Sequence, residues 1–241
     1  MNPAFETLRA NRREIYKAFL GQRSRGNTRF KKLAAILEQR GVPIGWTDRG
    51  KLNQIAGSGE HQGAALEVSG FEYADSDKLI ATAERILLLD NIEDPQNLGA
   101  ILRSAEIFGF GSVLLPTKGT PGVYPSVVKA SAGATEHLCI ARDKNAVGYF
   151  RSAKESGFTV IALDAGGTKP LSPVSGFAHH KLLLVIGGEN RSVGRYILNN
   201  ADHTTRIEQL GRVSSLNASV AAGVAMREFS LARTGGDAAS S

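Results

Sequence analysis

The sequence of 241 residues contains a single cysteine, Cys139. One cysteine excludes an internal disulfide and any zinc site built from several cysteines. Because Cys139 stands in an apolar run, residues 138–140, we expect it to be a buried strand residue. The near absence of cysteine favours a reducing, cytoplasmic setting.

Long apolar runs and common catalytic motifs are missing as well. The longest apolar run, Leu182–Ile186, is far shorter than the ~20 residues of a membrane span. No charged start leads into an apolar stretch at the N-terminus, so we expect no signal peptide. The five histidines lack ligand spacing, and we expect no metal. There is no Walker A motif, no dinucleotide-binding glycine fingerprint and no nucleophile elbow.

Positive charge is abundant, and it is concentrated at one end. Residues 1–32 carry nine Lys or Arg against two Glu, a charge of +7, which leaves −1 for the rest of a chain whose net charge is +6. A basic end on a near-neutral body is typical of a protein that binds a polyanion. A solvated basic helix without a partner stays open as the alternative.

The pattern divides the chain into residues 1–73, a linker over 74–82, a larger domain over 83–234 and a flexible tail over 235–241. In the first part we expect helices over 5–20, around 33–37 and over 48–56, and a strand over 61–68. The second part alternates apolar strands with amphipathic helices. The strands are expected at 85–89, 113–115, 137–141, 159–163, 181–186 and 204–207, and the helices at 96–108, 125–132, 145–156, 191–200 and 215–232.

Continuous apolar strands separated by helices predict an α/β fold whose parallel sheet is covered on both faces. Ligands of such sheets bind beyond the carboxyl ends of the strands. The loops that matter are therefore 90–97, 187–190 and 208–214.

Polar side chains in these loops are the candidate functional groups. Asn97 and Arg103 are six residues apart, so on one straight helix they lie about 120° off a shared face and converge only if Asn97 is in the entry loop. Glu189 follows two glycines after a buried strand, where a carboxylate can orient a hydroxyl or an arginine. Asn217 can offer an amide to a ligand, whereas Ser214 or Ser215 is a natural helix cap.

In these three loops the sequence resembles the SpoU (TrmH) family of the SPOUT superfamily, RNA ribose 2′-O-methyltransferases. The first family motif is Asn-x-Gly-x-x-x-Arg after Asp-Pro, here from Asp94 to Arg103, and the second is a strand that ends in Gly187-Gly188-Glu189. The third is the run 207–219, in which Glu208-Gln209 replaces the family's Pro-Met and Ala218 replaces Val.

The N-terminal part resembles the accessory RNA substrate-binding domain of the family through residues 41–43, Gly-Val-Pro, and 61–66, His-Gln-Gly-Ala-Ala-Leu. This layout is most similar to the RlmB type, which methylates a guanosine ribose of 23S ribosomal RNA. The resemblance implies a small α/β RNA-binding domain, a C-terminal domain with a trefoil knot, a homodimer and S-adenosyl-L-methionine as cofactor.

The resemblance also implies roles for ten residues. Arg103 is the favoured catalytic residue. Because a guanidinium is a poor base near neutral pH, we expect it to bind the neighbouring phosphate and polarise the 2′-hydroxyl. The residues that would position it and the ribose are Asn97, Glu189, Ser215 and Asn217. The residues that would contact the cofactor are Gly187, Gly188, Ile207, Leu210 and Leu216.

Two alternatives stay open at this point. One is a 2′-O-methyltransferase for transfer RNA, or one that modifies ribosomal RNA against an antibiotic. The other is a non-catalytic RNA-binding or ribosome-assembly protein, which the replacement Glu208-Gln209 favours and the intact Asn97, Arg103, Glu189 and Asn217 oppose.

Overall fold

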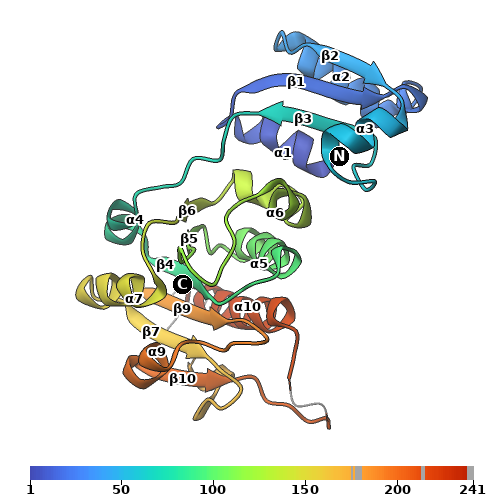
Figure 1. Cartoon of the computed structure of the whole chain (residues 1–241). Helices are drawn as coiled ribbons and strands as arrows, with labels where there is room; N and C mark the ends of the chain where they lie inside the picture. The colour runs from blue at the N-terminus through green and yellow to red at the C-terminus, as the bar shows by residue number, and fades with distance from the viewer. Residues whose placement is uncertain (175, 177–180, 213–214, 238–241) are drawn as a thin grey trace. The chain divides into compact units, whose positions relative to one another are not determined.

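The computed structural model describes residues 1–174, 176, 181–212 and 215–237 (Figure 1). By its internal contacts the chain divides into two units, unit 1 over Met1–Glu72 and unit 2 over Tyr73–Ser241. Among the helices of the described ranges, none has the length and apolar character that crossing a membrane requires.

Unit 1 is built on a three-stranded sheet in the order β2-β1-β3. Strand β1 (Ile15–Gly21) pairs in parallel with β2 (Ile44–Thr47) and antiparallel with β3 (Ala64–Val68). The helices are α1 (Asn2–Ala10), the 3₁₀ turn η1 (Gln22–Ser24), α2 (Thr28–Gln39) and α3 (Arg49–Ala56). Apolar side chains of α1, β1 and α2 form its core: Phe5, Leu8, Ala18, Leu20, Phe30, Leu33 and Leu37.

The single helix expected over residues 5–20 is wrong, because its second half is strand β1. Helix α1 ends where Asn11 adopts a left-handed conformation with φ of 53°. Beyond it Ala18 and Leu20 are fully buried while Phe19 between them is not, so the buried positions repeat every second residue. The burial of every second residue therefore marks this segment as a strand, although its number of apolar residues would also suit a helix.

The strand expected from His61 is also shorter than predicted. It begins at Ala64, because Gln62 and Gly63 have φ of 51° and 83°, which no strand residue adopts. Residues 61–63 therefore form a turn before β3.

Unit 2 contains a seven-stranded sheet in the order β6-β5-β4-β9-β7-β10-β8, and every pair in it is parallel. This confirms the predicted α/β fold with a parallel sheet. The strands are β4 (Arg85–Asp90), β5 (Ser112–Leu114), β6 (Cys139–Ala141), β7 (Thr159–Leu163), β8 (Lys169–Pro170), β9 (Leu182–Gly187) and β10 (His203–Arg206).

Helices cover both faces of this sheet (Figure 1). On one face α4 (Ser76–Thr82), α7 (Ala146–Glu155) and α9 (Arg195–Asn200) share a core with alternate residues of β4, β7 and β9. On the other face lie α5 (Pro95–Ile107), α6 (Pro125–Ala130) and α10 (Ala218–Asp237). The short elements η2 (Ala134–Glu136) and α8 (Leu171–Val174) complete the unit.

Three local expectations for unit 2 need correction. The linker expected over 74–82 instead contains α4, where Asp75 caps the helix and Leu79 and Ile80 are buried in the core. Helix α10 continues through Asp237 into the expected tail, of which residues 238–241 lie outside the described ranges. Cys139 is exposed, because it begins strand β6 at the edge of the sheet.

Candidate active site

A pocket opens at the carboxyl ends of β7 and β9, where the parallel sheet predicts a ligand site. Its enclosed volume is about 180 Å³. Three segments form it: the ends and following loops of β7 and β9, and the chain on both sides of the start of α10. The lining residues are Leu163, Asp164, Ala165, Ile186, Gly187, Gly188, Glu189, Ser192, Ile207, Gln209, Ser215, Leu216, Ala218 and Ala221.

The carboxylate of Glu189 joins three segments at the edge of this pocket. Its Oε1 accepts hydrogen bonds from Nδ2 of Asn97 at 3.2 Å, from Nδ2 of Asn217, and from the backbone N–H of Ala218 at 3.2 Å. Asn217 Nδ2 also donates to Asn97 Oδ1 at 3.0 Å. The first helix after β4, the loop after β9 and the last helix therefore meet at one anion.

Asn217 and Glu189 together satisfy the start of α10. Asn217 Oδ1 accepts from the backbone N–H of Ser219 at 2.9 Å and from that of Val220 at 3.4 Å. The first N–H groups of a helix have no partner within the helix, and the helix dipole favours a negative charge beside them. The Glu189 carboxylate supplies this charge, so Asn217 is at once a helix cap and a site residue.

Glycine is required where the β9 loop passes its neighbours. A Cβ on Gly188 would lie 2.0 Å from the carbonyl oxygen of Asn91, and a Cβ on Gly187 would lie 2.3 Å from the backbone nitrogen of Val193. We expected these glycines to let a ligand approach the main chain. The structure adds a second reason, because backbone already occupies the space on one side of each.

Asp90 lies under the site at the end of β4, and its side chain is 6% exposed. Its Oδ2 accepts from the backbone N–H of Gly194 at 2.9 Å, which ties the end of β4 to the loop after β9. Burial raises the pKa of Asp90 above its usual value, and the Gly194 hydrogen bond opposes that shift.

The structure brings together most of the residues that the sequence indicated. Gly187, Gly188, Ile207, Ser215 and Leu216 line the pocket, and Asn97, Glu189 and Asn217 are hydrogen-bonded to one another.

Two of the expected site residues lie apart from this group. Leu210 is fully exposed and does not line the pocket. Arg103 is exposed, and no hydrogen bond or ion pair links it to the described part of the chain. Asn97 is inside α5 rather than in its entry loop, so the six-residue spacing separates it from Arg103 by about 9 Å along the helix and about 120° around it. Val213 and Ser214 of the third motif lie outside the described residues.

Sequence reasoning missed the contribution of the β7 loop. Asp164 lines the pocket and its Oδ2 accepts from Oγ of Ser192 at 2.6 Å. The sequence does contain a pattern that could have indicated Asp164. This residue follows a buried strand and stands close to a pair of glycines, Gly166-Gly167, much as Glu189 stands beside Gly187-Gly188 after another buried strand. Within the described residues, no group of three His, Cys, Asp or Glu side chains could hold a metal ion.

Comparison with known proteins identifies the family to which this chain belongs. The model of the SpoU rRNA methylase family matches residues 84–227, and the model of the RNA 2′-O ribose methyltransferase substrate-binding domain matches residues 1–74. The chain belongs to the SpoU family of RNA methyltransferases.

Individual relatives agree with this assignment. A TrmH family tRNA/rRNA methyltransferase of Bacillus subtilis, YacO, is 35% identical over 234 residues, which cover 94% of this chain and 92% of YacO. An uncharacterized tRNA/rRNA methyltransferase of Mycobacterium tuberculosis is 35% identical over 239 residues, which cover 96% of this chain and 73% of the relative.

Solved structures share the fold at lower identity. An rRNA methyltransferase from Sinorhizobium meliloti with bound AdoMet has a TM-score of 0.78 at 22% identity, over 98% of this chain and 85% of that one. The SpoU methyltransferase AviRb from Streptomyces viridochromogenes, in complex with AdoMet, has a TM-score of 0.79 at 19% identity, over 97% of this chain and 88% of that one.

The substitution Glu189→Ala tests the junction at the start of α10. Removing the carboxylate leaves the N–H of Ala218 and the amide of Asn97 without this acceptor, while the amide of Asn217 keeps Asn97 Oδ1, and at this exposed position the loss costs about 1 kcal/mol. We expect the first turn of α10 to exchange its amide hydrogens about fivefold faster, measured by hydrogen–deuterium exchange. Glu189→Gln, which keeps an oxygen acceptor, should lie between Ala and wild type. Unchanged exchange in Glu189→Ala, or an equal effect of Asn190→Ala, would contradict this account.

Asp90→Asn should raise the melting temperature of unit 2 at pH 7. An acid whose pKa is raised by folding stabilises the folded state below its unfolded pKa, and that stabilisation is lost as the pH rises through the folded pKa. At pH 7 the buried charge is therefore a cost, which Asn removes while it keeps an acceptor for Gly194. Calorimetry should show the advantage shrinking as the pH falls through the raised pKa of folded Asp90, and vanishing below 3.8, the ordinary pKa that applies to the unfolded chain. Glu93→Gln, at an exposed acid of the same loop, is the control, and it should leave the melting temperature of unit 2 unchanged both at pH 7 and at low pH.

Proposed function

We propose that this chain transfers a methyl group from S-adenosyl-L-methionine to a ribose 2′-oxygen of RNA. The observation that carries the proposal is the junction of Asn97, Glu189 and Asn217 at the mouth of the pocket formed by the ends of β7 and β9. Membership of the SpoU family and the two AdoMet-bound structures of the same fold support the cofactor.

The lining of the pocket suits a nucleoside cofactor that carries a positive charge. Leu163, Ile186 and Leu216 offer apolar contacts, and the carboxylate of Asp164 and the amide of Gln209 offer polar ones. The volume of about 180 Å³ is below the ~300–1,000 Å³ of typical small-molecule pockets. A cofactor of this size would therefore extend beyond the pocket, and Leu210, next to Gln209, is free to contact the part that protrudes.

When bound, the cofactor supplies a methyl group activated by a positively charged sulfur. The residues of the chain then have to align the ribose and stabilise charge on its 2′-oxygen. We assign Arg103 to the phosphate next to the target ribose and to the developing charge on the oxygen. Asn97, Glu189, Ser215 and Asn217 form the polar surface on which the ribose would be oriented. The proton of the hydroxyl passes to solvent.

We assign unit 1 to RNA binding and favour 23S ribosomal RNA, with a guanosine ribose as the target. The match to a substrate-binding domain over residues 1–74 and the basic residues of the first 32 positions support this assignment. The names of the relatives include both transfer and ribosomal RNA, so the choice between these RNAs needs a direct assay.

The assay is transfer of tritium from labelled S-adenosylmethionine to unmodified ribosomal RNA, with transfer RNA and DNA in parallel. We expect label at one guanosine ribose of 23S RNA and none in DNA, which lacks the 2′-hydroxyl. Label in transfer RNA alone would preserve the reaction and overturn the substrate. The absence of label together with no cofactor binding in calorimetry would favour the non-catalytic RNA-binding protein.

Arg103→Ala in the same assay should lower kcat by about 10²–10³, because it removes a charge that acts on the transition state. The affinity for the cofactor should be unchanged, since Arg103 does not line the pocket. Arg195→Ala, which removes an exposed arginine on α9, is the matched control and should keep wild-type turnover. Full turnover in Arg103→Ala would remove the assignment.

We also propose that the chain acts as a homodimer. Helix α10 and the residue before its cap expose an apolar stripe at spacings of four, four and seven residues: Leu216, Val220, Val224 and Leu231. The neighbouring helix α5 exposes Ile107 at 63%. Helix α5 also carries Ser104, whose Oγ would lie 3.7 Å from a Cβ on Gly223 of α10, so α5 packs against α10 here, and the preceding residue of α5, Arg103, is exposed. A partner on this stripe would therefore approach Arg103.

Val224→Glu places a charge in the middle of this stripe. We expect the wild-type chain to have the mass of a dimer in light scattering, and the variant to dissociate about a hundredfold more readily. Ile55→Glu makes the same change at an exposed residue of unit 1 and should leave the mass unchanged. A wild-type monomer at high concentration would overturn the proposal.

A further inference from the structure

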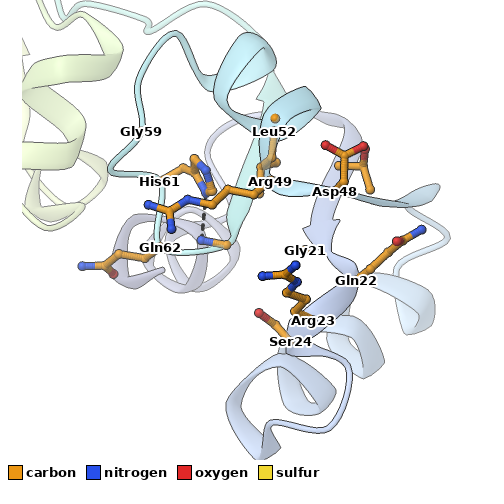
Figure 2. A pocket seen from close by; sticks show the side chains of 13 residues that line it. Gly21, Gln22, Arg23, Ser24, Asp48, Arg49, Leu52, Gly59, His61 and Gln62 are labelled. Atoms are coloured by element: carbon orange, nitrogen blue, oxygen red, sulfur yellow. Dashed lines mark hydrogen bonds between the residues drawn. The ribbon is translucent and has the colours of Figure 1, made fainter.

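Unit 1 contains a second and larger cavity, of about 730 Å³ (Figure 2). Three loops form it: the turn η1 after β1, the loop between β2 and α3, and the turn before β3. Its volume lies within the ~300–1,000 Å³ typical of pockets that hold small molecules. The cavity belongs entirely to unit 1, so it can be described without reference to unit 2.

Two arginines from different loops line this cavity. Arg23 lies in η1 and Arg49 is the first residue of α3. Figure 2 shows the Arg49 side chain extending toward His61, and the Arg23 guanidinium beside Ser24. Neither arginine makes a hydrogen bond or ion pair with the described residues of the chain. Guanidinium groups without an internal partner suit the oxygens of a phosphodiester, which they bind in bidentate fashion.

The acid in the lining, Asp48, forms no ion pair with either arginine, so two positive charges and one negative charge leave the lining with a net charge of +1. Asp48 Oδ1 accepts from the backbone N–H of Lys51 at 3.0 Å, so its carboxylate caps α3. The cavity therefore keeps two unpaired positive groups in one hollow.

The turn that carries His61 is held rigid. His61 Nδ1 accepts from the backbone N–H of Gly63 at 2.9 Å, so the ring proton is on Nε2, which is 2.8 Å from Oδ1 of Asn53. Gly63 has φ of 83°, and a Cβ there would lie 2.8 Å from Cζ of Phe30. The turn is thus fixed between His61 and Phe30, and the imidazole has one orientation.

Beneath the rim, the cavity has a less polar floor. Leu52 is fully buried and Thr47 is 9% exposed, and both line the cavity. A fixed imidazole suits stacking with a flat aromatic group, and Gln22 and Gln62 in the lining carry amides that can hydrogen-bond to the edge of a base. The hollow therefore combines anion binding with contacts for a planar ring.

We propose that this cavity takes one unpaired nucleotide of the RNA substrate. Its phosphates lie between Arg23 and Arg49, and its base lies against the imidazole of His61. The inference rests on RNA being the substrate of the proposed function, and it adds where and in what form unit 1 recognises that RNA. A base within a duplex is stacked and paired, so a bulge, a loop or an extruded base is required.

The test uses the full chain with two fluorescent RNAs of equal length, a hairpin with an unpaired loop and a blunt duplex. The wild type should prefer the hairpin. Arg23→Gln and Arg49→Gln should each weaken hairpin binding about tenfold and lower the slope of log affinity against log salt by about 0.7. Abasic nucleotides in the loop should weaken wild-type binding by about tenfold through lost stacking.

A matched control separates the cavity from general electrostatic attraction. Lys32→Gln removes the same charge from the exposed face of α2, outside the cavity, and should change hairpin affinity by less than about threefold. Trp46, the single tryptophan, lies in β2, next to Thr47 of the cavity lining. Its fluorescence reports whether unit 1 is folded in each variant.

Three results would overturn the inference: arginine variants that bind as wild type, an equal loss in Lys32→Gln, or equal affinity for hairpin and duplex. Methyl transfer is measured on the same variants. If the wild type transfers no methyl group but hairpin binding depends on both arginines, the cavity stands and the proposed reaction fails. If the variants transfer methyl groups with unchanged KM, the reaction stands and the cavity fails.

Discussion

The architecture of the candidate active site depends on how closely two backbone segments approach at the carboxyl edge of the sheet. Gly188 passes Asn91 at a distance that no side chain allows. This contact brings the next residue, Glu189, to the starts of α5 and α10, where its carboxylate accepts three hydrogen bonds. A larger residue at position 188 would push the loop away and separate the amides that now meet there.

The same carboxylate connects the site with the surface that we assign to the dimer. It anchors the N-terminus of α10, and the exposed stripe of that helix begins at Val220, three residues after the cap Asn217. The orientation of the stripe is therefore coupled to the geometry of the pocket. Arg103 is absent from the network and is exposed on α5, which packs against α10. The proposed assembly therefore offers a physical route by which this unpaired arginine could join a site that already holds its other polar groups.

Much of unit 2 could be predicted from the sequence, because its strands are continuous apolar runs between helices and its site residues stand in recognisable motifs. Unit 1 was harder, because β1 shares its apolar residues with a helical pattern and is revealed only by the alternate burial of Ala18 and Leu20. Cys139 was misplaced because sequence does not show which strand is at an edge. Contacts between distant loops, such as Asp164 with Ser192, could not be inferred from either segment alone.

Two features of unit 1 would contribute to RNA binding in different ways. The +7 charge of residues 1–32 attracts any polyanion over a range set by salt, and that attraction carries little information about sequence or shape. Discrimination needs groups whose positions are fixed before the RNA arrives. In the cavity of unit 1 the imidazole meets this condition, because two hydrogen bonds hold it. The arginines break no internal hydrogen bond or ion pair when they bind, because they make none with the described residues. Binding there costs little reorganisation, so contacts made only by an unpaired nucleotide can be converted into selectivity.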